Sequence, residues 1–438
     1  MNRIDLEIKA RSPLAIGKQK PSSSVSEADE YISGSVIRGA IAAQILQQSG
    51  HSSNDFSTNG GDFQNLFLGD RPAIFQNAYP VTATTKDEND PEKTITLVLP
   101  EVQVLPSTAL SSKNSSGFKN ELDKNNKPKS NGVFDTLIDR FCAEVYGHLY
   151  DPNCPTDGDR VDAFTGFYGI ANGKYYKPSV DKRLLTRVGI NRRRAISEEQ
   201  ILYSIEVMNE LKIPSKPHKP EPSIYRSSIY VDDADLAASL QQFIHANSQQ
   251  FRFGGSTSRG LGKTEIAAIL SKQVKSDLTQ RVNSFNDKLA DRWKDWQIFG
   301  KSQEDVTKNR KFFTLDLQSD AILTDQWRRT TVISEAMLKQ FTGIGDPSLK
   351  LHVVYSSYDY RSGWNAAWGL MKDVELVTNR GGVYLFSVEV NEKGDRSAEW
   401  LEALELLEIT GVGDRTSEGF GQVQVCNDFH LVLREESV

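Results

Sequence analysis

A glycine-rich stretch, FGGSTSRGLGKTEI at residues 253–266, carries residue types that bind phosphate. It ends in GKT, as does the nucleotide-binding loop G-x-x-x-x-G-K-[ST]. That motif needs a glycine at the position of Thr257, and it needs a strand before the loop and a helix after it. Here the pattern predicts a helix before and a strand after. The stretch therefore argues against a nucleoside triphosphatase, and a phosphate-binding backbone loop or a tight packing turn remains.

The same pattern occurs a second time near the C-terminus. SRGLGKTEI at 258–266 aligns with SEGFGQVQV at 417–425, and Gln422 stands where the first copy has Lys263. Each copy follows a predicted amphipathic helix. A repeat of helix, glycine loop and strand predicts two copies of one domain. Because each copy also carries an arginine, Arg259 or Arg415, we favour contact with an extended phosphate backbone over a mere packing turn.

Three residue types that bind zinc lie close together in CAEVYGHLYDPNC, at Cys142, His148 and Cys154. A structural zinc site uses four ligands, and this spacing matches no common zinc module. The alternative is a helix cysteine, a surface histidine and a loop cysteine. The three residues are therefore only weak metal candidates, and no cofactor is expected.

Composition narrows the class of protein. The chain has 438 residues with a net charge of −6, and 38% of its residues are hydrophobic. No apolar run is long enough to span a membrane, and the N-terminus lacks the apolar core of a signal peptide. With only three cysteines, we expect a cytoplasmic protein without disulfides. The acidic balance argues against wholesale coating of nucleic acid, but it leaves room for a local basic groove.

The densest basic region is residues 180–194, with six basic residues and one acidic one. A run of charge is usually a solvated face, but in an acidic protein this one favours contact with RNA or a partner. A second mixed segment is YDYRSGWN at 358–365, where Tyr358, Tyr360 and Trp364 flank Arg361. Exposed aromatic rings stack on splayed bases, although aromatic residues more often fill cores.

Periodicity predicts the elements that must position these residues. Strands are expected at 3–16, 72–83, 94–105, 202–207, 224–232, 264–270, 312–323, 349–360 and 381–390. Helices are expected at 36–48 with a cap at Ser33 or Ser35, and at 133–147, 233–250, 331–341 and 397–410. Two polar segments, 50–62 and 107–132, are predicted to be flexible or disordered in isolation. The charged segment 272–300 is predicted to be a helical linker.

At this point the sequence resembles the RAMP superfamily of CRISPR-associated proteins. A helix followed by a glycine-rich loop is one landmark of that superfamily, and YISGSVIRGAIAA at 31–43 resembles a second, with Ser33 in place of a proline. VGINRRRAISEEQILYSIEV at 188–207 resembles its hairpin segment. SGWN at 362–365 and NRGGVYLFSVE at 379–389 resemble type III subunits that hold the 5′ end of the guide RNA. Taken together, these segments look most like the Csx-ten family of Cas-five-like subunits in type III-D effector complexes.

The resemblance implies an α+β fold with two ferredoxin-like domains, residues 1–271 and 311–438, joined by a helical linker at 272–310. It implies a non-catalytic subunit that binds the 5′ tag of the CRISPR RNA, the neighbouring RAMP subunits and a large signalling subunit, and that meets target RNA only indirectly. Such a subunit nucleates assembly of the effector complex for antiviral defence. We therefore expect RNA contacts from residues of the helix start, the basic region, the aromatic segment and both loops: Arg38, Lys182, Arg183, Arg187, Arg192, Arg193, Arg194, Gly254, Gly255, Ser256, Arg259, Gly260, Lys263, Tyr360, Arg361, Trp364, Gly413, Arg415 and Gly419.

The alternative is an enzyme, a metal-independent endoribonuclease acting on CRISPR-associated RNA. Members that cut RNA carry an aspartate before the glycine–serine helix, which makes Asp29 a weak catalytic candidate. Asp29 could instead complement the helix N-terminus or be solvated. The six histidines, His51, His148, His218, His245, His352 and His430, show no pattern that supports a general base.

Overall fold

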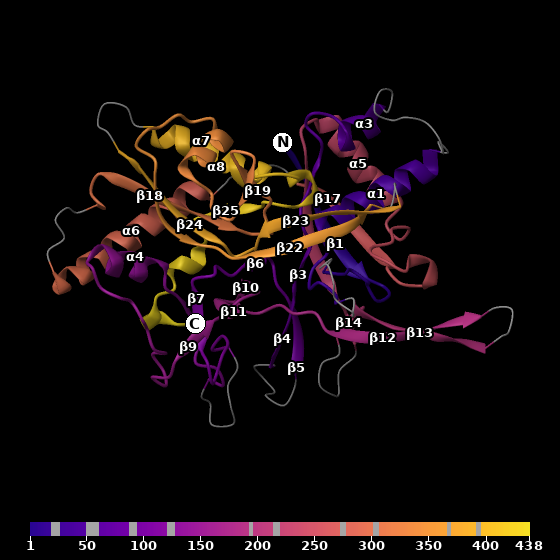
Figure 1. Ribbon diagram of the computed structural model, residues 1–438, viewed down its shortest axis with the longest axis horizontal. Helices are drawn as coiled ribbons and strands as arrows, with labels where there is room; N and C mark the ends of the chain where they lie inside the picture. Colours follow the sequence, from indigo (N-terminus) through magenta and orange to yellow (C-terminus); the bar gives the residue numbers. More distant parts are fainter. Residues whose placement is uncertain are drawn as a thin grey trace.

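The computed structural model describes residues 1–18, 27–49, 61–86, 94–120, 128–191, 196–212, 220–271, 277–300, 306–365, 369–390 and 396–438. Every structural statement below concerns these residues. In Figure 1 two sheets with their helices lie side by side along the longest axis, and hairpins project below and to one side.

The N-terminal sheet has β1 (Asn2–Ala10) at its centre. Its order is β17-β1-β16-β2, and β3 also pairs with β16. The flanking strands are β2 (Ile74–Phe75), β3 (Tyr79–Pro80), β16 (Ile224–Val231) and β17 (Thr264–Ser271). Apolar residues alternate along β1, so that Ile4, Leu6 and Ile8 enter the core beneath α1 (Gly34–Ser49) and α5 (Ala234–Ala246). Sequence periodicity predicted β1, α1, α5 and β17 correctly, with ends shifted by a few residues.

The C-terminal sheet repeats this arrangement with the order β21-β24-β18-β25. Its strands are β18 (Arg310–Leu317), β21 (Lys350–Tyr355), β24 (Val383–Glu389) and β25 (Val423–Val425). Its helices are α7 (Glu335–Thr342), which Ser334 caps, and α8 (Ser397–Thr410). In both halves the first strand lies between the third and fourth strands, and a glycine loop precedes the fourth. The internal repeat inferred from the sequence is therefore confirmed.

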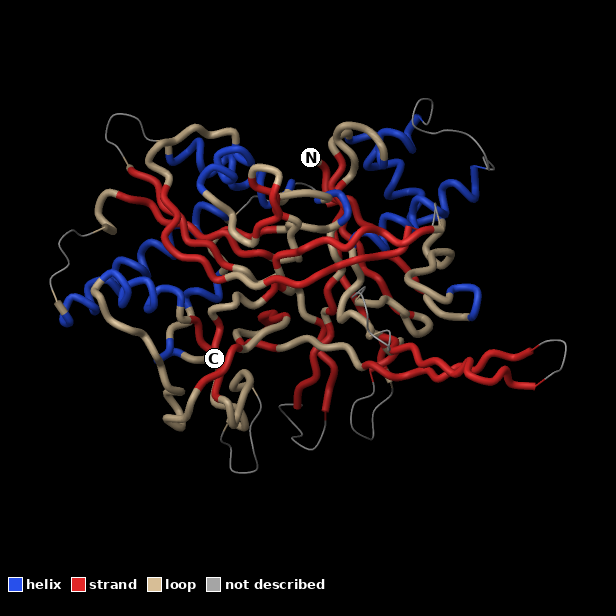
Figure 2. Tube along the Cα trace, in the orientation of Figure 1, coloured by secondary structure: helices blue, strands red, loops and turns tan. Residues whose placement is uncertain are grey.

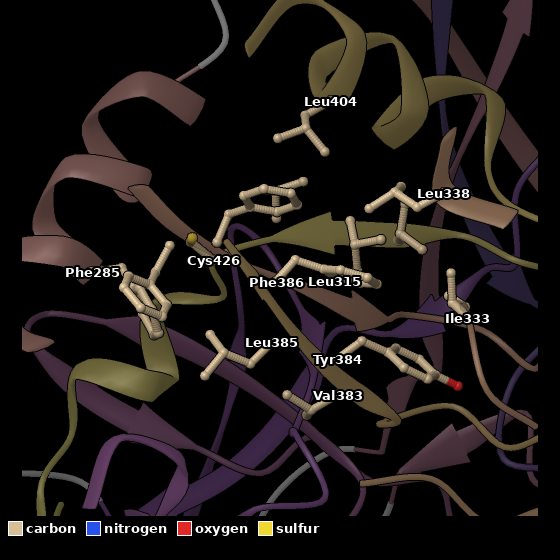
Figure 3. Close-up of a cluster of buried hydrophobic side chains, with 14 of the residues drawn as sticks. Phe285, Leu315, Ile333, Leu338, Val383, Tyr384, Leu385, Phe386, Leu404 and Cys426 are labelled. Atoms are coloured by element: carbon tan, nitrogen blue, oxygen red, sulfur yellow. The ribbon is translucent and has the colours of Figure 1, made fainter. Parts of the chain in front are cut away.

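The core of the C-terminal half is the larger of the two. Figure 3 shows Leu315, Tyr384, Phe386 and Leu404 packed between the sheet and its helices, with Cys426 at the edge of the cluster. Burial raises the pKa of the Cys426 thiol to about 12, so this cysteine is an inert core residue.

Further strands and short helices decorate these two sheets. The longest are the hairpins β12–β13 (Lys182–Asn191, Ile196–Met208) and β22–β23 (Tyr358–Asn365, Leu370–Thr378), and β19–β20 (Leu323–Asp325, Arg328–Thr330) is a shorter hairpin. The others are β4 (Thr82–Lys86), β5 (Thr94–Val98), β6 (Gln103–Val104), β7 (Ala109–Ser112), β8 (Val133–Asp135), β9 (Val161–Ala163), β10 (Phe167–Ala171), β11 (Lys174–Tyr176), β14 (Leu211–Lys212), β15 (Glu221–Pro222) and α3 (Gly61–Phe67). Figure 2 shows the β12–β13 ribbon projecting from the body.

The segment 107–132 corrects one expectation. Residues 121–127 lie outside the described residues, but Ala109–Ser112 forms β7, which is buried. Leu110 and Phe118 pack against Phe134 in a separate small core, and this apolar content explains why the segment is ordered there. The expected helix at 133–147 also divides into β8 and α4 (Leu137–Val145). The predicted flexibility of residues 50–60 falls outside the described part of the chain.

The predicted helical linker at 272–300 is the second expectation that the structure corrects. Helix α6 (Leu278–Trp296) forms where a helical linker was predicted, but Val282, Phe285 and Leu289 on one face are buried in the C-terminal core. Helix α4, which precedes α6 by more than a hundred residues, packs in the same core. The division at residues 271 and 311 stays a prediction, because elements from both sides of it share a core.

None of the helices that the structure describes is both long and apolar enough to cross a membrane.

Candidate nucleic-acid interface

The two glycine loops have almost the same backbone conformation. Loop 1 is residues 254–263 and loop 2 is residues 413–422. Ser256 in loop 1 has φ 57° and ψ 30°, and Arg415 in loop 2 has φ 58° and ψ 33°. At the other end of each short 3₁₀ turn, Gly260 and Gly419 have φ 89° and 90°. These left-handed values explain why a glycine follows the 3₁₀ turn in both loops.

The same hydrogen bonds hold each loop to the segment after the first strand of its own half. In loop 1 the amides of Gly255 and Gly262 donate to Ala15 O (2.8 Å) and Pro13 O (2.9 Å). In loop 2 the corresponding amides of Asp414 and Gly421 donate to Ile322 O (2.8 Å) and Asp320 O (2.9 Å). In loop 1 the amides of Gly260 and Lys263 also donate to protein oxygens. These amides already have acceptors within the protein, so they are not available to an anion, and a backbone nest in the rest of loop 1 stays a prediction.

The surroundings of the two loops differ. Residues 257–260 at the tip of loop 1 are exposed, and nothing lies within 4 Å of a methyl group placed on Gly260. The tip of loop 2 is covered by the N-terminal half. A methyl group on Gly419 would lie 2.6 Å from Asn77 Oδ1 and 3.1 Å from Gly34 Cα. Loop 2 therefore acts as a packing turn between the halves, and loop 1 is open to a ligand.

The arginines of the two loops are not equivalent. When the two loops are matched by backbone conformation, Arg259 is equivalent to Glu418, and Ser256 is equivalent to Arg415. Glu418 lies 2.6 Å from the guanidinium of Arg415 and 3.1 Å from the amine of Lys372. These cations outweigh the effect of burial and lower the pKa of Glu418. Arg415 is therefore neutralised within the protein.

Loop 1 lies beside the β12–β13 hairpin. The guanidinium of Arg259 donates to the hydroxyl of Tyr203 on β13. Arg187 on β12 and Lys263 at the end of loop 1 make no ion pair with the residues that the structure describes. Arg252 donates only to backbone carbonyls, those of Gln249 and Phe251. Within the part of the chain that the structure describes, these cations of the loop and the hairpin are therefore not neutralised by carboxylates.

Other predicted cations are engaged. Arg38 donates to the carbonyl of Phe67 at 2.5 Å and lies 5.6 Å from the centre of its ring. Burial lowers the pKa of Arg38. Lys182 donates to Ala28 O at 2.9 Å, and Arg183 pairs with Glu210 at 3.1 Å. These three side chains fix the hairpin and the first helix to the body.

Arg361 occupies the interior rather than the surface. Its guanidinium lies 3.1 Å from Asp29 and 2.8 Å from Asp320, and it donates to Lys18 O at 2.9 Å. The Arg380 side chain lies beside it, 4.8 Å from the ring centre of Tyr31. Arg361 thus joins β22 to the N-terminal half, and its donors face protein carboxylates and a carbonyl.

Asp29 is only 5% exposed, so neither proposed alternative, solvation or helix complementation, describes it. Burial raises the pKa of Asp29, while Arg361 and Arg380 act in the opposite direction. Its carboxylate is committed to an ion pair between the halves. This position gives no support to Asp29 as a nuclease residue.

The zinc candidates are not brought together. Cys142 is buried in α4, and burial raises the pKa of its thiol to about 12. His148 is at the surface with Nε2 3.3 Å from Phe299 O, and Cys154 is buried in a loop. Among the described residues, no group of three or more His, Cys, Asp or Glu side chains could hold a metal ion.

The aromatic segment is divided. Tyr358 and Tyr360 are 61% and 49% exposed on β22, with ring centres 6.1 Å apart. The side chain of Trp364 and the residues Arg192, Arg193 and Arg194 lie outside what the structure describes. The RNA contacts predicted for Trp364, Arg192, Arg193 and Arg194 therefore stay predictions.

Arg252 and Tyr203 were missed by the sequence argument. Arg252 directly precedes the glycine stretch, and its charge was the available signal. Tyr203 carried no such signal, because it reaches Arg259 only through the tertiary fold.

Comparison with known proteins gives a family and a set of distant folds. The model of the RAMP superfamily matches residues 7–265, and no curated protein matches the chain. A chain in a type III-B Cmr-beta structure bound to cognate target RNA and AMPPnP has a TM-score of 0.38 and 12% identity, covering 87% of this chain and 86% of that one. A Cas6 product complex has a TM-score of 0.35 and 8% identity over 97% and 100% of the chains. Oligomeric Cmr4 from Pyrococcus furiosus has a TM-score of 0.26 and 9% identity over 62% and 100%.

The family match spans the first sheet from β1 to the start of β17, including α1, the β12–β13 hairpin and all of loop 1. It therefore covers more than half of the chain, including loop 1 and the hairpin, but not loop 2 or the aromatic segment on β22. This protein belongs to the RAMP superfamily.

Proposed function

We propose that this chain is a non-catalytic RNA-binding subunit of a type III CRISPR effector complex, most like the Csx-ten family, that binds the 5′ tag of the CRISPR RNA. The observation that carries the proposal is a group of four cations on loop 1 and the hairpin: Arg259, which binds Tyr203, Arg187, which pairs with Tyr203 across β12 and β13, and Arg252 and Lys263, which bridge the base of loop 1. Lysine and arginine side chains neutralise the phosphates of RNA, and the ring of a tyrosine beside them can stack on a base. We call this group the loop 1 cluster.

The fold is consistent with this role. In each half the order strand, helix, strand, strand, helix, strand with the first strand between the third and fourth matches two ferredoxin-like domains. Sheets of this kind bind single-stranded RNA through exposed faces and loops. Contacts to the RNA backbone leave the base edges of a guide free to pair.

The contrast between the two loops makes the proposal specific. Loop 2 is covered and its arginine is paired with Glu418, whereas the tip of loop 1 is exposed. Of the two glycine loops, we therefore assign the RNA contact to loop 1, together with the hairpin. The proposal gives up the symmetrical arrangement in which both loops line the RNA.

The endoribonuclease alternative has no supporting side chain among those described. Burial lowers the pKa of His352 to about 4, with help from Lys350 and Arg310, and His430 is held between two carboxylates. Incubation of the purified chain with repeat RNA checks this point. Specific cleavage that a single Asp or His substitution abolishes would overturn the non-catalytic role.

The experiment on the loop 1 cluster measures RNA affinity against salt concentration. The double variant Arg187→Ala/Arg259→Ala is expected to lose about 1.4 units of the slope of log K against log [salt], because each phosphate contact with a single strand contributes roughly 0.7. The probe is RNA with the repeat-derived 5′ tag, and a scrambled tag reports specificity.

Arg415→Ala is the matched control, since its guanidinium already has a carboxylate partner. The control is expected to leave the slope unchanged. An unchanged slope in the double variant would move the loop 1 cluster to a protein interface.

A further inference from the structure

The end of α6 carries an exposed apolar surface at the opposite end of the molecule from the β12–β13 hairpin (Figure 1). Ile298 is 86% exposed and Phe299 61% exposed, just beyond the helix. Leu149, on the segment after α4, is 94% exposed. We call Leu149, Ile298 and Phe299 the apolar platform. Large apolar groups left in water in this way mark interaction sites when they cluster.

Contacts between the two segments bring the platform together. The ring of His148 packs edge-on against Phe299 with centres 5.6 Å apart, and its Nε2 lies 3.3 Å from Phe299 O. Tyr150, the residue after Leu149, packs its ring against that of Trp296, with ring centres 6.0 Å apart. The rings of Trp296 and Phe299 also pack together, with centres 5.2 Å apart.

A buried carboxylate fixes the layer beneath the platform. Asp139 on α4 is fully buried and accepts hydrogen bonds from Trp296 Nε1 at 2.9 Å and from the Tyr150 hydroxyl at 3.2 Å. It also pairs with Arg292 at 2.5 Å. The aromatic side chains under the platform are thus held in place before any partner arrives, which lowers the entropic cost of binding.

The rim of the platform is acidic. It carries exposed carboxylates on α4, on the loop after it, on α6 and near the C-terminus: Glu144, Asp151, Asp291, Asp295 and Glu435. Two further cations lie among them, Lys294, which pairs with Asp291 at 2.9 Å, and Arg434, which donates to Asn153 O at 2.7 Å, so the carboxylates remain in excess. Arg292 is largely covered, between Asp139 and Glu435.

This charge decides between the classes of occupant. RNA phosphates and anionic lipids would be repelled by the rim, and a second copy of the chain would bring the same carboxylates face to face. A protein surface with an apolar pocket and a basic border satisfies both parts of the site. We propose that the apolar platform docks a protein partner of this chemistry, such as another subunit of the same assembly. The proposal rests on the proposed membership of a multisubunit complex, but it concerns a surface separate from the loop 1 cluster and does not depend on RNA binding.

The test uses the full chain in its assembled complex, purified through a tag on this chain. The photoreactive residue p-benzoylphenylalanine is placed at Leu149 or at Ile298, and at Ile269 as the control. Ile269 is 66% exposed on β17 of the other half. Both platform positions are expected to cross-link to one and the same protein, at peptides rich in Lys or Arg, whereas the control does not. Cross-links to nucleic acid, to a second copy, or equally from the control would overturn the proposal.

A second measurement covers the energetics. Leu149→Ser/Ile298→Ser is expected to reduce retention of the cross-linked partner about tenfold or more, as truncation of central apolar contacts does. Retention is also expected to fall as salt rises from about 0.1 M to about 0.5 M, because the acidic rim is screened. RNA affinity and the melting temperature of the free variant should stay unchanged, since both side chains are exposed. Full retention of the partner by the variant would sink the proposal.

Discussion

His430 shows how a residue with no motif around it becomes a key structural group. It is completely buried, with Nε2 2.8 Å from Asp316 on β18 and Nδ1 3.1 Å from Asp135 on β8. Burial would lower its pKa, but the two carboxylates outweigh burial and raise the pKa to about 10. The imidazolium therefore ties the C-terminal sheet to the β7–β8–β9 sheet.

The raised pKa of His430 predicts a loss of stability at alkaline pH. A group whose pKa is higher in the folded state contributes fully below its unfolded value, about 6.5, and the contribution disappears as pH rises towards 10. The free energy of unfolding is expected to fall by about 4 kcal/mol between pH 6 and pH 9.5. Urea unfolding at several pH values measures it.

His430→Gln provides the comparison, because it cannot take up the proton. The variant is expected to be less stable at pH 6 and to show a flatter profile across this window. Parallel profiles for the two proteins would contradict the assignment of the pH dependence to His430.

At the scale of elements, the glycine loops illustrate how one conformation serves two purposes. Both loops turn in the same left-handed geometry, and both bind back to their own half. Only loop 2 is inserted against the first turn of α1 and against β2, where Phe75 O lies 3.0 Å from a methyl group placed on Gly419. The repeat therefore predicts the shape of each loop but not its neighbours.

A pair of matched substitutions separates the two roles. Gly260→Ala adds only backbone strain and is expected to cost about 1–2 kcal/mol of unfolding free energy. Gly419→Ala adds the same strain and a clash with Asn77, for a further loss of about 1–3 kcal/mol. Chemical denaturation of both variants measures the difference. Equal losses would show that the contact of loop 2 with the N-terminal half is unimportant for stability.

At the scale of the whole molecule, several contacts join the halves. Loop 2 covers the start of α1, and Arg361 lies between Asp29 of the first half and Asp320 of the second. Helices α4 and α6 add a shared core. The halves should consequently unfold together.

Arg361→Met tests this coupling. It leaves two buried carboxylates without their cation and is expected to cost about 3–5 kcal/mol and to separate the unfolding of the halves into two calorimetric transitions. Arg183→Met is the control, because its pair with Glu210 is partly exposed and should contribute roughly 0–1 kcal/mol. An unchanged melting temperature together with weaker RNA binding would instead restore Arg361 to the RNA contact.

Much of the fold could be predicted from local patterns. Alternation along β1 and the periodicity of α5 and α8 identify these elements, because each buries one face against a sheet. The segment 107–132 was misjudged, since its polar composition hid Leu110 and Phe118, which become buried only against distant residues such as Phe429.

The sequence by itself determined the family, the repeat and the conformation of both loops, because these depend on residue type and short-range spacing. Only the tertiary structure decided which loop is free and which cations are available. Arg361, Arg415 and Arg38 carry the same charge as Arg259, but the first two pair with carboxylates and Arg38 is held at the carbonyl and ring of Phe67. Charge is visible in a sequence, whereas its neutralisation depends on residues brought together from far apart in the chain.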